Sequence, residues 1–169
     1  MIFFINLLDN DCELTGVING VLEICGDHIM FRSTKPEDYI SICANVPYET
    51  KLHWKHDLVK ECMKWFGQIF VDEELLHHFL KFCSSVLKGR NSDKIFPIMT
   101  GEGDNSKSMI VKLFESTLGP YCMKFDVSSV TSRNGNASGP TPQLARAKSK
   151  RVAFMDEPAD ECPRCFARA

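Results

Sequence analysis

One eight-residue stretch of the chain combines residue types that can hold a phosphate group. It lies between an apolar run and a predicted helix, and it reads Gly-Glu-Gly-Asp-Asn-Ser-Lys-Ser. Glycines let the backbone turn tightly, so that successive N–H groups and a helix N-terminus can face an anion. The expected phosphate-binding residues are Gly101, Glu102, Gly103, Asp104, Asn105, Ser106, Lys107 and Ser108.

The last residues of this stretch predict binding of ATP with Mg²⁺. Lys107 would reach the β- and γ-phosphates, and the Ser108 hydroxyl would bind the metal ion. The usual pattern, G-x-x-x-x-G-K-[ST], has a glycine where this chain has Ser106. A left-handed backbone at that position would cost serine about 1 kcal/mol or more relative to glycine.

A pair of acidic residues downstream provides the second part of such a site. The run 151–156 predicts a buried strand, which ends in Asp156 and Glu157. ATP-hydrolysing sites of this kind need one acid on the Mg²⁺ side and often another to activate the attacking water. We assign the first role to Asp156 and the second, catalytic role to Glu157, together with the catalytic lysine, Lys107.

The remaining pattern predicts the elements that position these residues. Short strands and turns are expected over 1–50. Helical periodicity predicts helices over 55–70, over 73–88 with Asp72 as N-cap and Gly89 as C-cap, and over 107–118. The apolar run 95–100 suits a buried strand, although Pro97 lacks a donor for a central ladder. A loop over 126–142 and a helical turn over 143–148 complete the prediction.

Composition and charge narrow the class of protein. The 169 residues are 44% hydrophobic and 25% charged, an ordinary globular balance with a net charge of −2. Residues 1–50 carry eight acids against two basic residues, whereas 133–151 carry five basic residues and no acid. The basic stretch is a candidate for facing phosphates, with a solvated loop as the equal alternative. No apolar run approaches the roughly 18–20 residues of a membrane span, and no signal peptide is expected.

Cysteine and histidine give weak indications of metal binding. Six single cysteines are expected to be small buried hydrophobic side chains in a reducing compartment: Cys12, Cys25, Cys43, Cys62, Cys83 and Cys122. Cys162 and Cys165 form a lone C-x-x-C pair, which rarely suffices for a metal site. His77 and His78 are expected to be exposed helix residues rather than ligands.

Taken in order, these motifs resemble those of the superfamily 3 helicases. The resemblance rests on the loop 101–108, on Leu118-Gly-x-Tyr121, on the segment from Pro142 to Arg151, and on the strand ending in Asp-Glu. It is closest to the primase–helicases of nucleocytoplasmic large DNA viruses of poxvirus and asfarvirus type. It covers about residues 15–161, and includes Asn19-Gly-Val and Pro36-Glu-Asp-Tyr-Ile40.

The resemblance implies a fold, a set of partners and a location. The loop 101–108 corresponds to the Walker A motif and 152–157 to Walker B. The implied fold is α/β: a partial P-loop NTPase core of AAA+-like type, preceded by a small mixed and helical region. Implied partners are ATP, Mg²⁺, DNA and further copies of the chain in a hexamer, with no membrane. The implied location is intracellular, at viral replication sites in the host cytoplasm or in the virion.

The resemblance also suggests how the chain is divided. We expect a strand and turn region over 1–54, a helical segment over 55–92, an incomplete P-loop core over 93–161 and an atypical tail over 162–169. The family's sensor asparagine and arginine finger have no counterpart here, so a chain truncated after Walker B, with weak ATP hydrolysis, marginal stability and a tendency to associate, is expected. The alternative is a non-enzymatic module that joins full-length helicase hexamers through 55–88. A kinase-like P-loop enzyme is a weaker third possibility.

Overall fold

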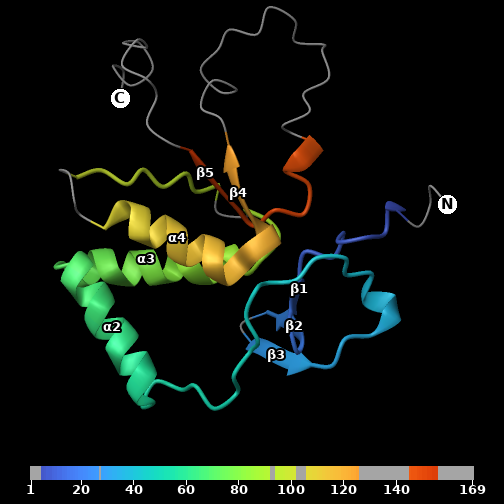
Figure 1. Ribbon diagram of the computed structural model, residues 1–169, viewed down its shortest axis with the longest axis horizontal. Helices are drawn as coiled ribbons and strands as arrows, with labels where there is room; N and C mark the ends of the chain where they lie inside the picture. The colour runs from blue at the N-terminus through green and yellow to red at the C-terminus, as the bar shows by residue number, and fades with distance from the viewer. Residues whose placement is uncertain (1–4, 27, 92–93, 102–105, 126–144, 156–169) are drawn as a thin grey trace, which may run out of the picture.

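The computed structural model describes residues 5–26, 28–91, 94–101, 106–125 and 145–155, and these form a mixed α/β protein (Figure 1). A three-stranded sheet comes first in the chain. Three helices follow, and a two-stranded sheet packs against the last of them. No helix of the described residues is long and apolar enough to cross a bilayer.

The first sheet confirms the expectation of short strands joined by turns. It consists of β1 (Leu14–Val17), β2 (Gly20–Cys25) and β3 (His28–Arg32), which pair antiparallel in the order β1-β2-β3. Register is set by the two-residue connections, so that Val17 pairs with Gly20 and Cys25 with His28. β1 and most of β2 are buried, while β3 is the exposed edge.

A cluster of charged side chains secures the end of β3. The Arg32 guanidinium donates two hydrogen bonds of 2.8 Å to Asp38, in the 3₁₀ helix η1 (Pro36–Asp38), and one of 2.5 Å to Glu23 on β2. The hydrogen bond from Arg32 lowers the pKa of Asp38 to about 2, while Asp38 and Glu23 raise the pKa of Arg32. The loop after β3 is thereby tied to the sheet.

The three helices lie close to their predicted positions. They are α2 (Asp57–Ile69), α3 (Glu73–Val86) and α4 (Lys107–Leu118). Asp72 is the N-cap of α3, as expected, because its carboxylate accepts a hydrogen bond from Glu74 N. A 3₁₀ turn, η2 (Gly119–Tyr121), ends α4, where Gly119 has a φ of 53°.

The second sheet pairs two strands in parallel. β4 (Cys122–Phe125) follows η2 directly, and β5 (Val152–Met155) pairs with it from Cys122–Val152 to Phe125–Met155. The strand expected over 151–156 is thus present. Of the helical turn expected over 143–148, residues 145 and 146 are helical and 147–149 form a turn. The loop over 126–142 lies outside the described residues.

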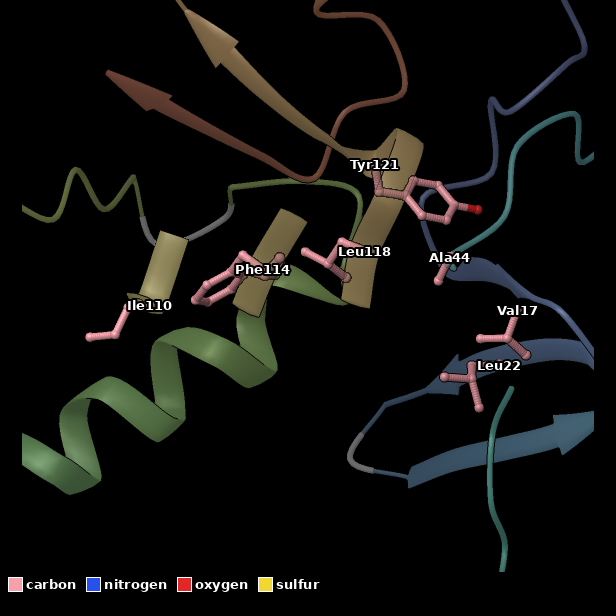
Figure 2. Close-up of a cluster of buried hydrophobic side chains, with 8 residues drawn as sticks. Val17, Leu22, Ala44, Ile110, Phe114, Leu118 and Tyr121 are labelled. Atoms are coloured by element: carbon pink, nitrogen blue, oxygen red, sulfur yellow. The ribbon is translucent and has the colours of Figure 1, made fainter. Parts of the chain in front are cut away.

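One hydrophobic core joins the two sheets to the helices. Figure 2 shows Val17, Leu22 and Ala44 on the side of the first sheet and Ile110, Phe114 and Leu118 along α4, with Tyr121 between the two groups. Aromatic rings continue the core outward, because Phe79 on α3 contacts Phe114, and Phe114 contacts Phe154 on β5. Helix α4, which carries the candidate lysine at its start, is therefore held from both sides.

The strand expected over 95–100 is wrong. Residues 94–101 have no regular secondary structure, and Phe96 and Ile98 are 66% and 62% exposed. A strand needs hydrogen-bonding neighbours, and no described segment pairs with this one, while Pro97 has no N–H to donate. An apolar composition alone therefore does not make this segment a strand, because a strand also needs a neighbouring strand to pair with.

Two further expectations are corrected. None of the six cysteines is fully buried: Cys25, Cys43 and Cys62 are exposed, and Cys12, Cys83 and Cys122 are half-buried, the last two packed against the core. Gly89 is not a left-handed C-cap. The helix ends at Leu87 in a right-handed conformation, and Gly89 instead fits beneath Arg151 and against the backbone of Cys12.

Candidate functional site

The structure describes both ends of the loop 101–108. Gly101 has a φ of 151°, a conformation that residues with a Cβ rarely adopt. At the other end, Ser106 is the N-cap of α4 and adopts the left-handed conformation, with φ 65° and ψ 7°. Position 106 therefore has the backbone that favours glycine, as expected from the pattern. Glu102, Gly103, Asp104 and Asn105 lie outside the described residues.

Lys107 closes this loop from within. Its Nζ donates a hydrogen bond of 2.8 Å to the carbonyl oxygen of Gly101, six residues earlier. The side chain is half-buried, whereas Ser108, on the first turn of α4, is exposed. The hydrogen bond thus joins Lys107, at the N-terminal end of a twelve-residue helix, to Gly101 at the other described end of the loop. A positive charge and the N-terminal end of a helix together favour an anion there.

The hydrogen bonds at the start of α4 involve the backbone of Ser106 and not its side chain. The carbonyl oxygen of Ser106 accepts hydrogen bonds of 3.0 Å from Met109 N and Ile110 N, which fixes the first turn. Ser106 makes no side-chain capping bond, so its hydroxyl does not cover the first N–H groups. An anion at the start of α4 would therefore displace no side-chain capping bond of Ser106.

The described part of β5 runs toward this loop. Arg151 N, just before the strand, donates to Tyr121 O beyond the C-terminal end of α4, whereas Phe154 contacts Phe114 in mid-helix at 5.5 Å between ring centroids. β5 is therefore antiparallel to α4 and points toward its N-terminal end (Figure 1). Asp156 and Glu157, the predicted metal-side and catalytic acids, come next in the chain and lie outside the described residues.

Sequence reasoning missed a junction built on Tyr121. This side chain is 2% exposed; its hydroxyl donates to Ile42 O and accepts from Gly16 N, each at 2.9 Å. Burial raises the pKa of the Tyr121 phenol. Arg151 stacks over its ring, 5.2 Å from the centroid, and donates to the carbonyl oxygens of Cys12 and Leu14. Both residues lie in motifs on which the family resemblance rests, but nothing in those motifs indicates that the two side chains contact each other.

In the described part of the basic stretch 133–151, some basic side chains bind the protein's own backbone and others are exposed. Lys150 donates to Pro120 O at 2.5 Å, so both Lys150 and Arg151 bind backbone carbonyls of the protein itself. Arg146 and Lys148 are exposed. His77 and His78 are also exposed, and no group of three potential metal ligands occurs among the described residues. Cys162 and Cys165 fall outside them.

Comparison with known proteins identifies related sequences. The chain is 36% identical over 151 residues to “Putative helicase 184R” of Invertebrate iridescent virus 6, and 31% identical over 155 residues to “Putative helicase L207/L206” of Acanthamoeba polyphaga mimivirus. It is 26% identical over 161 residues to “Putative primase C962R” of African swine fever virus. No protein-family model matches.

These matches cover most of this chain and a small part of each relative. They span 89%, 92% and 91% of the chain, but 15%, 16% and 16% of the respective viral proteins. The resemblance noted in the sequence is thereby confirmed, because both helicases and a primase of large DNA viruses align with nearly the whole chain. The chain is thus related to one segment of the primase–helicase type proteins of nucleocytoplasmic large DNA viruses.

Proposed function

We propose that residues 101–108 form an ATP-binding loop, and that the chain is the ATP-binding segment of a superfamily 3 DNA helicase acting in viral DNA replication. The single observation that supports this most is the closed loop, in which Lys107 Nζ reaches back to Gly101 O and Ser106 has a left-handed backbone. Both features suit a loop that wraps around a phosphate group. The viral relatives named as helicases agree with this function.

The proposed phosphate contacts follow from the loop geometry. In the proposal the Lys107 ammonium donates hydrogen bonds to the β- and γ-phosphate oxygens. Hydrogen bonds between ionised partners are about twice as strong as neutral ones, so phosphate is a strong acceptor for this ammonium group. The N–H groups at the start of α4 then face the same oxygens.

The metal ion would be held between α4 and the end of β5. The exposed hydroxyl of Ser108 is available on the first turn of the helix. β5 points toward the N-terminal end of α4, and Asp156 and Glu157 are the next two residues after this strand in the sequence. We therefore assign Asp156 to Mg²⁺ and Glu157 to the positioning of water. Bound Mg²⁺ would neutralise charge on the phosphates.

The test is calorimetric titration of the 169-residue chain with Mg·ATP. Wild type is compared with Lys107→Ala and with Lys112→Ala, a matched control because Lys112 is an exposed lysine of the same helix. We expect the Lys107 variant to lose at least tenfold in affinity and the control to match wild type. Equal affinities for wild type and Lys107→Ala, with intact circular dichroism, would overturn the proposal.

A second candidate function is an interaction module that joins full-length helicase assemblies. It is favoured by helix α2, which has no buried residue although its apolar side chains lie at helical spacing. Leu58 is more than half exposed, and so is Leu75 on α3. Capture of a full-length relative by the chain, undiminished by Lys107→Ala and lost on Leu58→Asp, would support this function. Capture that is unchanged by Leu58→Asp would contradict it.

A further inference from the structure

An exposed turn before α2 carries a tryptophan between basic residues. It is the segment Lys51–His56, which reads Lys-Leu-His-Trp-Lys-His. Trp54 is 74% exposed and is the most exposed aromatic side chain among the described residues. Tryptophan is highly buried on average, so a tryptophan displayed at a turn carries more meaning than an exposed aliphatic residue.

The turn is held by its own hydrogen bonds. His56 N donates to His53 O at 2.8 Å, which places Trp54 and Lys55 at the two central positions. Lys55 N donates to the imidazole Nδ1 of His53, and the His53 and His56 rings lie edge to face with 6.3 Å between their centroids. The imidazole of His56 caps α2 by accepting from Leu58 N. The turn that carries Trp54 is therefore fixed by its own hydrogen bonds and directly precedes the start of α2. That end of α2 is the one farther from α3 (Figure 1).

The charges around Trp54 are positive. Asp57 forms an ion pair with Lys60 at 2.8 Å, so that these two charges cancel. Lys51 and Lys55 are exposed, and neither forms an ion pair with any residue that the structure describes. Glu49 precedes Lys51 by two positions. A flat apolar ring next to two free ammonium groups matches an unpaired base next to its phosphates.

We propose that Trp54, Lys51 and Lys55 form a contact site for single-stranded nucleic acid, separate from the loop 101–108. The base stacks on the indole ring, and the two lysines pair with adjacent phosphates. A duplex is disfavoured, because its bases are already stacked on one another and present no free face. The site requires no nucleotide, so it stands or falls independently of the proposed ATP-binding loop.

The test measures binding of a fluorescein-labelled oligothymidylate of about 16 nucleotides, the upper site size for one binding fold, by anisotropy without Mg²⁺ or ATP. Trp54→Ala should raise Kd about 5- to 150-fold, the loss expected for one stacked base. In a Trp65→Phe background, where Trp54 is the only tryptophan, the oligonucleotide should quench the fluorescence. Circular dichroism checks that each variant is folded.

Salt dependence tests the lysines. The pair Lys51→Gln and Lys55→Gln should lower the slope of log Kd against log salt by about 1.4, since each contact to a single strand contributes about 0.7. The matched pair Lys81→Gln and Lys88→Gln, exposed on and just after α3, should leave the slope unchanged.

Three results would overturn the proposal. The first is a Kd of Trp54→Ala within twofold of wild type. The second is Trp54-dependent binding to anionic lipid vesicles with none to the oligonucleotide, which would indicate a membrane contact. The third is binding that Lys107→Ala abolishes and Trp54→Ala leaves intact.

Discussion

Replacing Ser106 with glycine should stabilise the protein. A left-handed conformation costs a residue with a Cβ about 1–2 kcal/mol, and Ser106 pays this cost at φ 65°. Glycine loses more chain entropy on folding, which offsets about 0.4–1 kcal/mol of the gain. No capping bond is lost, because the serine side chain makes none. The net expectation is a stabilisation of about 0.5–1 kcal/mol.

The assay is thermal unfolding of the full chain, followed by circular dichroism and calorimetry. For a protein of this size, about 0.5–1 kcal/mol corresponds to an increase in Tm of roughly 1–4 °C. Ser106→Ala is the control, since alanine keeps the Cβ and also lacks a capping bond; its Tm should stay within about 1 °C of wild type by the same scale.

One result would refute this reasoning. If Ser106→Gly were no more stable than Ser106→Ala, the backbone at position 106 would not be strained in solution. The loop would then lack the left-handed turn on which the proposed phosphate site depends. Higher Mg·ATP affinity in Ser106→Gly would be a separate, functional consequence of the same geometry.

Three further predictions concern stability. Tyr121→Phe should lower the free energy of unfolding in urea by about 1–3 kcal/mol, because the Gly16 N–H and the Ile42 carbonyl lose their hydrogen-bond partner. The control is Tyr48→Phe, whose hydroxyl makes no described hydrogen bond and whose loss should change stability by less than about 0.5 kcal/mol. Gly89→Ala should lower the Tm, since the added Cβ would lie 2.8 Å from the Cα of Cys12. Gly67→Ala is the control: position 67 is within helix α2 and has room for a Cβ, so this change should raise stability by about 0.5–1 kcal/mol. The lowered pKa of Asp38 means that its contribution is present above about pH 4 and is lost on acidification toward pH 2, so Asp38→Asn should flatten the pH dependence of unfolding in that window; an unchanged slope would contradict the pairing.

The helices could be predicted because their information is local. The Asp72 carboxylate caps α3 by accepting a hydrogen bond from Glu74 N, two residues later, and α4 has the predicted bounds 107–118. The left-handed backbone at Ser106 also followed from the pattern alone, since the motif has glycine there. In each case the determining contacts lie within a few residues in the sequence.

The failures concern contacts with distant parts of the chain. Residues 95–100 have the composition of a strand, but strand pairing requires a neighbouring strand, and the local sequence pattern does not show whether one is present. Gly89 follows a helix as a C-cap glycine would, but a side chain is excluded at this position because Arg151 lies too close. The cysteines were expected to be buried because several occur among apolar residues, but Cys62 on α2 is exposed.

The Arg151 anchor has a consequence for folding during synthesis. Its guanidinium binds carbonyls 137 and 139 residues earlier in the chain. The first sheet ends at Arg32, so at about 5–20 residues per second it is synthesised roughly 6–24 s before the arginine that secures it. For most of that interval, until Tyr121 has been synthesised, β1 to β3 also lack the buried tyrosine hydroxyl. A chaperone that recognises exposed apolar strands would therefore meet this protein at its N-terminal sheet, and would be displaced when residue 151 arrives.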